Sequence, residues 1–583
     1  MAMRTTPLLN ISIDELSPIS ALADIELFER IPIEERLTVS SIYGLIAKAA
    51  EQRPDANAIT FLPLGLVSDN PVHLTNGALL ECVTQAANLF HSLGVAANDG
   101  VAILLPNLPE SYIAMWGAST CGIAVPVNPL LSQAHLAEIL RAARVRVVVT
   151  VGPSSDPALW AKVEGLSSLV DSLQTVLVVG EVPNGVRSFT DLNDFPANRL
   201  VSGRIPNLDD IASCFHTGGT TAAPKLVSHT HRQHLITAVQ GLLGSDMRSG
   251  DVVLSALPTF HVIAGIATGM IAIAGGATLL MPGANGFRNP YLLMDFWKII
   301  ERYRVTSFTS VPTVIGILLD IPITSDISSL KYVSCGAAPL PAELIRAFEA
   351  KTGAPIIESY GMTEATTMVA SNPRAGTRHP GSVGFPAPYL RVRIALIDLD
   401  GSYLADSQPG EEGAVFLQGP NVVGGYVGDA LATSAIPEWF PTGDLGRVDG
   451  DGHLWLSGRS KDLIIRSGHN IDPRLIEEAL HMHPAVAAAA AVGRPDAYAG
   501  EVPIAFVTLR AGQTVTTDEL WAFAREHVSE RPAAPAEVII LSEMPTTALG
   551  KVYKPDLREL AQSRSTSSEA FKWSAPANIT PSH

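Results

Sequence analysis

Apolar residues along this chain fall into two kinds of run, and their spacing predicts a mixed α/β protein. Short, almost wholly apolar runs of strand length recur at 101–105, 123–127, 145–151, 211–215 and 332–335. Segments with a helical spacing of apolar residues lie between and after them, at 39–52, 80–93, 136–143, 231–243 and 291–304. Strands that alternate with helices in this way indicate βαβ units around a mostly parallel sheet. The predicted fold class is therefore α/β.

The pattern changes near residue 380, where short strands separated by turn residues replace the alternation. This texture predicts a β-rich subdomain over about 380–458, and past Gly458 helices and strands mix again. We therefore predict a large N-terminal domain built on βαβ-type sheets, followed by a small, mobile α+β domain. The predicted divisions are an irregular extension over 1–36, the large domain over 37–459, the small domain over 460–562 and a disordered tail rich in Ser, Thr and Pro over 563–583.

One uncharged stretch, from Val262 to Met281, is long enough to raise the question of a membrane span. Gly275 and Gly276 interrupt it, which predicts a helix followed by a short strand. The first 16 residues lack the basic region and apolar core of a secretory signal. The 4 cysteines are widely spaced and follow no metal-ligand pattern, as in a reducing compartment. We therefore predict a cytoplasmic protein without a transmembrane segment.

Composition narrows the range of partners. Of the 583 residues 47% are hydrophobic and only 17% are charged, which fits large buried sheets. The formal net charge of −17 disfavours nucleic acid or an anionic membrane as the main partner. Anionic substrates would have to be held by local groups, and the oligomeric state stays open, with a homodimer as one option.

A loop with the chemistry of a phosphate-binding site follows the apolar run 211–215. It reads Phe215-His216-Thr217-Gly218-Gly219-Thr220-Thr221-Ala222-Ala223-Pro224-Lys225. Glycines let backbone N–H groups turn toward an anion, threonine hydroxyls add donors, and the lysine supplies a positive charge. The spacing differs from that of a P-loop NTPase. The alternative is a polar turn between two strands.

This loop resembles the phosphate-binding loop of the adenylate-forming superfamily, which includes acyl- and aryl-CoA synthetases, peptide-synthetase adenylation domains and beetle luciferases. The chain departs from the usual pattern at His216, Gly218, Ala222 and Leu226. The resemblance implies an ATP-binding role for a set of loop residues, namely Thr217, Gly218, Gly219, Thr220, Thr221 and Lys225.

A second motif, Glu358-Ser359-Tyr360-Gly361-Met362-Thr363-Glu364, matches the superfamily's Y-G-M-T-E signature without a departure. The resemblance places Tyr360 on the adenine, Thr363 at the α-phosphate and Glu364 at Mg²⁺, a cation that prefers carboxylate and phosphate oxygens. It also implies nucleotide contacts for the flanking residues Glu358, Ser359 and Gly361 and for the earlier segment Gly336, Ala337 and Ala338. Without the loop upstream, a strand-to-turn junction with a solvated glutamate would explain this motif equally well.

Five later residues, in four motifs, resemble the superfamily's remaining signature positions, in family order. Asp444, in a Thr-Gly-Asp sequence, and Arg459 would contact the ribose. Lys461 would be the hinge at which the last domain rotates, and Gly468 would then approach the adenylate beside the pantetheine tunnel. Lys551 would bridge the attacking carboxylate and the α-phosphate, although an arginine frequent at the start of its motif is Thr546 here. Thr363 and Glu364 complete the implied catalytic set.

Together these matches imply an AMP-forming acyl-CoA synthetase that uses ATP, Mg²⁺ and coenzyme A to activate a carboxylic acid through an acyl-AMP intermediate. Amino-acid-activating members carry an aspartate near 260–261, and this chain has Phe260 and His261 there, which disfavours an amino acid. His261, Gly265 and Gly336 are the candidate residues around the acid, and the small residues favour a fatty or bulky apolar acid.

Two alternatives remain at this point. An acyl-AMP ligase could instead load the phosphopantetheine of a carrier protein, although the insertion common near the hinge of fatty acyl-AMP ligases does not interrupt 458–473. A noncatalytic nucleotide-binding homologue is disfavoured because Glu364, Asp444, Arg459 and Lys551 are all present.

Overall fold

The structure is a computed structural model, and two compact units make up the chain. The residues that it describes are 6–10, 18–217, 225–397, 403–427, 439–459, 462–467, 469–496, 498–547 and 550–565. The large unit comprises 1–457 with 548–551, and the small unit comprises 458–547 with 552–583. Each unit is described by itself below.

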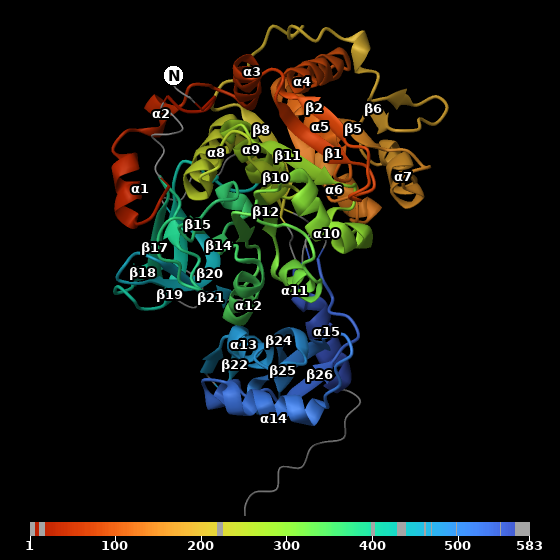
Figure 1. The fold of residues 1–583 in the computed structure, drawn as a ribbon. Helices are drawn as coiled ribbons and strands as arrows, with labels where there is room; N and C mark the ends of the chain where they lie inside the picture. Colours follow the sequence, from red (N-terminus) through yellow and green to blue (C-terminus); the bar gives the residue numbers. More distant parts are fainter. Residues whose placement is uncertain are drawn as a thin grey trace, which may run out of the picture. The chain divides into compact units, whose positions relative to one another are not determined.

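The first sheet of the large unit has seven strands, and the antiparallel pair at one of its edges flanks the candidate phosphate loop. Figure 1 labels several strands of this sheet. Its strands, in spatial order, are β7 (Arg187–Ser188), β6 (Thr175–Val179), β5 (Val145–Val151), β3 (Gly100–Leu104), β4 (Ile123–Pro126), β8 (Ile211–His216) and β9 (Leu226–Thr230). All neighbours pair in parallel except β8 and β9, which form an antiparallel hairpin. Because parallel strands begin and end at common edges, the residues after β8 lie at the carboxyl edge, where ligands of open α/β sheets bind.

A second, nine-stranded sheet carries the Tyr360 motif. Its order is β16 (Phe385–Pro386), β15 (Ala370–Ser371), β14 (Ile356–Tyr360), β13 (Tyr332–Cys335), β12 (Ser307–Ser310), β10 (Val252–Leu254), β11 (Thr278–Pro282), β1 (Asn57–Leu62) and β2 (Val72–Thr75). The strands from β14 to β1 are parallel, and antiparallel strands close both edges. The carboxyl end of β14 therefore presents Tyr360 and the residues that follow it.

Helices pack between and around these sheets. They are α1 (Leu22–Glu29), α2 (Ile33–Arg36), α3 (Ile42–Gln52), α4 (Asn76–Ser92), α5 (Pro109–Cys121), α6 (Gln133–Ala142), α7 (Pro157–Glu164), α8 (His231–Ser245), α9 (Gly269–Gly275), α10 (Pro290–Tyr303), α11 (Pro312–Asp320) and α12 (Ala342–Thr352). Short 3₁₀ turns add η1 (Leu166–Ser168), η2 (Leu192–Asp194), η4 (Gly286–Arg288) and η5 (Thr363–Ala365), and η3 (Ile263–Thr268) is π-helical.

One continuous core joins the two sheets. It contains residues of β3, β5 and β8 from the first sheet and of β1, β10 and β11 from the second, together with helices α3, α4, α5, α8 and α9. Helix α5 is buried from Ser111 to Cys121, because helices α3 and α4 and strands β3, β4 and β8 pack against it, and Gly269 of α9 lies close to its Tyr112 and Trp116 rings. An all-round apolar helix is typical of such an enclosed position.

The N-terminal extension is more ordered than the sequence predicts. Its described part holds two helices, α1 and α2, where we expected irregular chain. The Tyr389 hydroxyl donates to the Ile31 carbonyl at 2.7 Å, and Arg36 stacks 3.9 Å over the Phe28 ring while donating to the Phe28 carbonyl. The apolar residues of α1 do not gather on one face and α2 is only four residues long, so neither shows a helical pattern in the sequence; contacts distant in sequence stabilise them instead.

The β-rich segment forms an antiparallel sheet, as predicted. Its order is β18 (Tyr403–Asp406), β17 (Arg391–Ile397), β19 (Gly413–Gln418), β20 (Phe440–Val448) and β21 (Leu454–Arg459). Strand β20 carries Asp444 and pairs antiparallel with β19, which in turn pairs antiparallel with β17.

The small unit is α+β, again as predicted. Its elements are β22 (Ile464–Arg466), β23 (His469–Ile471), α13 (Pro473–His481), β24 (Val486–Asp496), β25 (Gly500–Leu509), α14 (Thr517–His527), η7 (Arg531–Ala533), β26 (Glu537–Ile540) and α15 (Lys554–Ser565). Strand β25 is central in the sheet, where it pairs with β22, β26 and, in a long hairpin, β24. Two apolar clusters drawn only from 464–561 include residues of this hairpin. The predicted fold class, α/β with a large N-terminal unit, a β-rich sheet and a small α+β unit, is therefore confirmed.

The uncharged stretch 262–281 folds as η3, α9 and β11, and the break at Gly276 adopts the left-handed backbone of a helix end (φ 70°). Throughout the part of the chain that the structure describes, no helix combines the length and apolar character needed to cross a bilayer. At the other end, residues 563–565 of the predicted tail belong to α15, and 566–583 lie outside the described residues.

Candidate active site

The two ends of the candidate phosphate loop lie side by side. Strands β8 and β9 pair through His216 and Leu226, and the Thr217 N–H donates to the Lys225 carbonyl at 2.8 Å. Lys225 is exposed at the carboxyl edge of the sheet. The other candidate loop residues, Gly218, Gly219, Thr220 and Thr221, lie outside the described residues. The hairpin thus closes the loop at its base, next to the predicted anion-binding lysine.

The turn that carries Thr363 and Glu364 is held by its backbone carbonyls. It follows β14 as the 3₁₀ turn η5. The carbonyls of residues 363 to 366 each accept a hydrogen bond from another segment, of 2.7 to 2.8 Å; the donors are His229 Nε2, the Val423 N–H, Asn421 Nδ2 and Thr237 Oγ1. Buried carbonyls must find donors, so these contacts fix the path of the turn.

Backbone strain marks the same turn. Thr366 and Thr367 adopt left-handed backbone with φ of 50° and 97°, which β-branched residues rarely do. Just before the turn, a Cβ on Gly361 would lie 1.7 Å from the Thr367 carbonyl oxygen, so only glycine fits there. Strained residues persist where surrounding contacts over-determine them, and they cluster at functional sites.

Tyr426 connects the two predicted phosphate- and metal-binding groups. Its hydroxyl donates to Glu364 Oε1 at 2.7 Å, and its ring lies 4.5 Å from Lys225 Nζ. Glu364 is buried, with 8% of its surface exposed. Among the described residues no cluster of three or more His, Cys, Asp or Glu has the arrangement of a protein-only metal site. Mg²⁺ commonly binds one or two carboxylates plus substrate phosphates, so a single ordered carboxylate fits this cation.

Tyr360 and Asp444 come together from β14 and β20. The Tyr360 hydroxyl donates to Asp444 Oδ2, and the Asp444 N–H donates to the Thr442 hydroxyl at 3.0 Å. Gly443 adopts the left-handed backbone (φ 75°) that turns the chain at this point. The structure thus brings together two residues assigned to the nucleoside from motifs far apart in the sequence.

The ends of β13 and β14 are tightly packed. A Cβ on Gly336 would lie 2.7 Å from the Ser359 carbonyl oxygen, and Ala337 adopts a left-handed φ of 70° although it is not a glycine. Ala338 follows, partly buried. Glu358 accepts the Gly381 N–H at 3.0 Å, and burial raises the pKa of its carboxyl group to about 8. Glu358 therefore supports the base of the site as a buried, largely protonated acid.

His261 and Gly265 lie at the start of η3. Burial, together with His216 and the charge of Lys551, lowers the pKa of His261 to about 3. Gly265 is required by close packing, because a Cβ there would lie 2.4 Å from the Thr259 carbonyl oxygen and 3.1 Å from the Phe215 ring. Its role as a wall of the acid site stays a prediction.

The remaining candidates lie late in the chain. Arg459 ends β21 and is exposed, while Lys461 and Gly468 lie outside the described residues. Lys551 groups with the large unit, and the carbonyl of the preceding Gly550 accepts the Thr313 hydroxyl at 3.3 Å. The roles implied for these residues stay predictions.

Sequence reasoning missed three residues that organise the site, namely His229, Asn421 and Tyr426. None lies in a motif that we singled out, and each acts on residues more than 50 positions away. His216, which replaces the usual aromatic residue, accepts the Asn128 N–H on its Nε2 at 3.1 Å, and burial lowers its pKa to about 4. A histidine at that position can therefore serve as a neutral packing residue.

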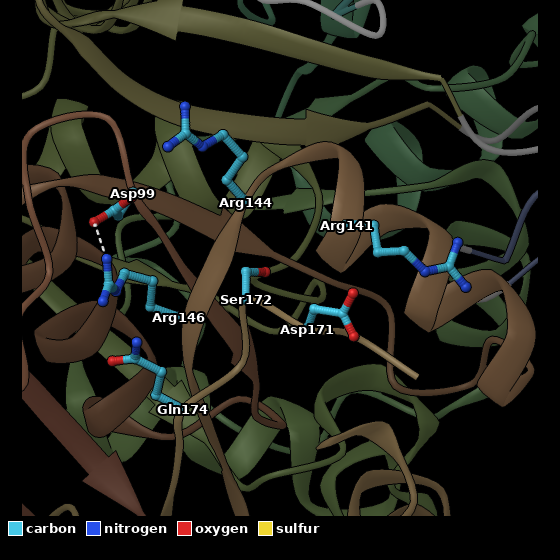
Figure 2. A pocket seen from close by; sticks show the side chains of 7 residues that line it. All are labelled: Asp99, Arg141, Arg144, Arg146, Asp171, Ser172 and Gln174. Atoms are coloured by element: carbon cyan, nitrogen blue, oxygen red, sulfur yellow. Dashed lines mark hydrogen bonds and ion pairs between the residues drawn. The ribbon is translucent and has the colours of Figure 1, made fainter. Parts of the chain in front are cut away.

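A hollow lined by three arginines lies away from these residues (Figure 2). It is found at the amino edge of the first sheet, where residues such as Asp99 and Arg144 immediately precede strands β3 and β5. Arg146 pairs with Asp99 at 3.3 Å, and Arg141 donates to the Leu169 carbonyl. Because the phosphate loop is at the opposite, carboxyl edge, this hollow is not part of the candidate active site.

Comparison with known proteins identifies relatives along nearly the whole chain. The model of the AMP-binding enzyme family matches residues 46–427, and that of the AMP-binding enzyme C-terminal domain matches 475–551. A marinolic acid–CoA ligase of Pseudoalteromonas sp. (strain SANK 73390) is 40% identical over 546 residues, covering 92% of this chain and 84% of the relative. A long-chain-fatty-acid–CoA ligase of Bacillus subtilis (strain 168) is 32% identical, covering 91% and 96%.

Solved structures also resemble this chain over most of its length. An anthranilate CoA ligase in complex with anthranoyl-AMP superposes with a TM-score of 0.79 at 25% identity, covering 90% of this chain and 98% of that one. ATP-bound MatB from Rhodopseudomonas palustris superposes with a TM-score of 0.76 at 25% identity, covering 89% and 98%.

Proposed function

The chain belongs to the AMP-binding enzyme family, and from that membership we propose that it activates a bulky, apolar carboxylic acid through an acyl-AMP intermediate held at the site described above. Its relatives are CoA ligases, and the protein is accordingly an AMP-forming acid–thiol ligase that uses ATP and CoA. The acid, the roles of individual residues and the participation of Mg²⁺ are the parts that we propose.

The observation that carries the choice of acid is the neutral, apolar character of the segment after His261. The low pKa of His261, about 3, keeps its ring uncharged at neutral pH, and no charged residue follows through Met281. A second charge on the acid would find no counter-ion there and would lose its hydration. A relative named for long-chain fatty acids supports an apolar acid for this chain as well.

In the first half-reaction, a carboxylate oxygen of the acid attacks the α-phosphorus of ATP, and the bond from phosphorus to pyrophosphate breaks. We assign Lys551 and Thr363 to the α-phosphate and the Thr217–Lys225 loop to the polyphosphate. Asp444 and Arg459 take the ribose, and Tyr360 lies against the adenine. Positioning and charge neutralisation account for most of the catalysis in phosphoryl-type transfers, which suits this set of groups.

Glu364 is the residue that we assign to Mg²⁺. Its Oε1 accepts the Tyr426 hydroxyl, and the carboxylate so held would bind a cation together with the ATP phosphates. When bound, Mg²⁺ would offset negative charge on the phosphates during transfer. Lys225, 4.5 Å from the same tyrosine ring, adds a second positive charge on the phosphate side.

In the second half-reaction, the CoA thiol attacks the acyl carbon of the adenylate and AMP leaves. We propose that the small domain rotates about Lys461 between the two steps, which withdraws Lys551 and brings Gly468 toward the adenylate. Hinge residues at domain edges commonly absorb such a motion.

The test is AMP formation from ATP with a panel of carboxylic acids, with and without free CoA, comparing wild type with Lys551→Ala. We expect CoA-dependent turnover that favours apolar acids, and a fall in adenylation of about 10²- to 10³-fold in the variant, as for loss of one transition-state donor. Lys554→Ala is the matched control, because Lys554 pairs with Glu477 at 2.8 Å and has no assigned role in catalysis.

Three outcomes would revise the proposal. Adenylate formation without thioester formation on free CoA would point to a carrier-protein acceptor. Preference for small or doubly charged acids would contradict the apolar acid. Full adenylation by Lys551→Ala would remove the role assigned to that lysine.

A further inference from the structure

His229 makes the first of the four carbonyl contacts on the Thr363–Thr366 turn. It lies in β9, four residues after Lys225, and is fully buried. Its Nε2 lies 2.7 Å from the Thr363 carbonyl oxygen. A carbonyl oxygen can only accept, so Nε2 must carry the proton and donate it.

This contact joins two parts of the site. Strand β9 starts directly after Lys225, so the same strand holds the base of the phosphate loop and His229. On the other side, Val227 of β9 bridges to Tyr426, whose hydroxyl holds Glu364. The turn is therefore connected to β9 in two ways. The Thr363 carbonyl contacts His229 directly, and the Glu364 carboxylate is held by Tyr426, which bridges to β9.

A histidine at this position has a cost in folding stability. In the part of the chain that the structure describes, His229 Nδ1 is buried and has no hydrogen-bond partner. A buried acceptor without a donor lowers stability, and a leucine of similar size would avoid that loss. The imidazole is therefore best explained by what Nε2 does.

The charge state of the ring also suits the position. Burial lowers the pKa of His229 to about 4, and the groups around it are the neutral rings of Phe215 and His234 and the Thr363 carbonyl. A neutral donor can hold the turn without placing a positive charge beside a bound cation, as a lysine or arginine would.

We propose that His229 is a positioning residue for metal–nucleotide binding: through the Thr363 carbonyl it sets the turn that presents Thr363 and Glu364 to the ATP phosphates and Mg²⁺. This inference rests on the proposed roles of Thr363 and Glu364. Nothing in the sequence motifs includes this histidine.

The experiment compares His229→Leu, which removes the donor, with His229→Gln, whose side-chain amide can restore it. The readouts are the dissociation constant of α,β-methylene ATP with and without Mg²⁺, measured by calorimetry, and the Mg²⁺ concentration that half-activates AMP formation. We expect His229→Leu to weaken binding about tenfold with Mg²⁺ and much less without it, as for loss of one hydrogen bond. His229→Gln should restore binding to within about threefold.

His234→Leu is the matched control. His234 is also buried in this cluster, its ring lies 6.1 Å from that of His229, and its Nδ1 likewise has no partner among the described residues. It contacts Ser213 at 2.8 Å. We expect His234→Leu to change thermal stability and to leave the Mg²⁺ dependence of nucleotide binding as in wild type.

Equal Mg²⁺ dependence in His229→Leu and wild type would overturn the inference. A failure of His229→Gln to restore binding, or the same shift in His234→Leu, would do so too, because core packing would then explain the effect. The Glu364→Gln variant distinguishes a failure of this inference from a failure of the proposed function. If that variant shifts Mg²⁺ dependence and His229→Leu does not, only the positioning role fails; if neither shifts, the metal role of Glu364 fails.

Discussion

The Glu358 carboxyl group shows how burial sets the chemistry of a single residue. The side chain is 8% exposed and has one backbone donor, the Gly381 N–H, so its charged form is poorly compensated. Burial raises its pKa from 4.5 to about 8, and Glu349 nearby adds to the effect. A motif glutamate that looks like a ligand in the sequence is therefore largely protonated at neutral pH.

This pKa predicts a pH-dependent difference in stability between Glu358→Gln and wild type. The folded state of the wild type holds the Glu358 proton more tightly than the unfolded state does. The stability that this proton adds to the wild type is therefore complete below pH 4.5 and is lost as pH rises through about 8. We expect the unfolding free energy of Glu358→Gln to rise relative to that of wild type between pH 5 and pH 9. The gain in unfolding free energy is about 1.4 kcal/mol for each unit of pKa difference, measured by urea denaturation.

Glu343→Gln provides the control, because Glu343 is 55% exposed and pairs with Arg346 on the surface. Its difference from wild type should be the same at pH 5 and pH 9. A pH-independent difference for Glu358→Gln as well would show that the Glu358 carboxyl group is ionised at neutral pH.

The residues of the site fall into two groups: some stand in a recognisable sequence motif, and others do not. Lys225, Tyr360, Glu364 and Asp444 stand in short motifs whose residue types suit phosphate, base, metal or ribose, so the sequence alone marks them as candidates. Tyr426 and His229 act through partners 62 and 134 positions away, and a lone tyrosine or histidine in an apolar segment looks like core. Only the folded chain shows which carbonyl or carboxylate each one meets.

At the scale of elements, strands with continuous apolar runs were the easiest to predict. Strands β3, β4, β5, β8 and β13 all fall within a residue of the expected runs. The apolar run 252–257 also predicts a strand, and the structure has one over Val252–Leu254 only. The helices α1, α2 and α15 were missed, since each is short or polar and is stabilised by tertiary contacts.

The π-helical segment η3 depends on a glycine at a fixed position. A methyl group on Gly265 would meet the Thr259 carbonyl oxygen at 2.4 Å, and the Thr259 N–H is itself held by Asn107 Oδ1 at 3.1 Å. We expect Gly265→Ala to lower the unfolding free energy by about 1–3 kcal/mol, as overpacked cores do. Thermal and urea denaturation measure the change.

Gly316→Ala is the matched substitution in a regular helix, α11, where the added methyl group meets no atom within 4 Å. There the loss of glycine should raise stability by about 0.4–1 kcal/mol. If both variants changed stability by the same amount and sign, close packing at η3 would not be the reason for Gly265.

At the scale of the whole molecule, each unit has cores of its own. Four apolar clusters contain residues only from 8–456, and the other two contain residues only from 464–561. Among the described residues, no cluster draws on both units. Units with separate cores can fold and move separately, which a ligase with two successive half-reactions can exploit.

We therefore expect a fragment of residues 1–459, which keeps β21 intact, to fold cooperatively and to bind Mg²⁺–α,β-methylene ATP within about tenfold of the full chain. The groups assigned to the nucleotide, apart from Lys551, all lie in this fragment. Adenylation should fall by about 10²- to 10³-fold, because the fragment lacks Lys551. Calorimetry and AMP formation measure the two quantities.

Comparing the fragment with full-length Lys551→Ala shows why the fragment loses adenylation activity. If the fragment and the variant lose adenylation equally and both bind the analogue, residues 460–583 contribute to the first half-reaction mainly through Lys551. A fragment that folds but no longer binds the analogue would contradict the assignment, because the nucleotide site would then require further residues from 460–583. If adding residues 460–583 as a separate chain restores adenylation, a covalent connection between the two pieces is not required for the first step.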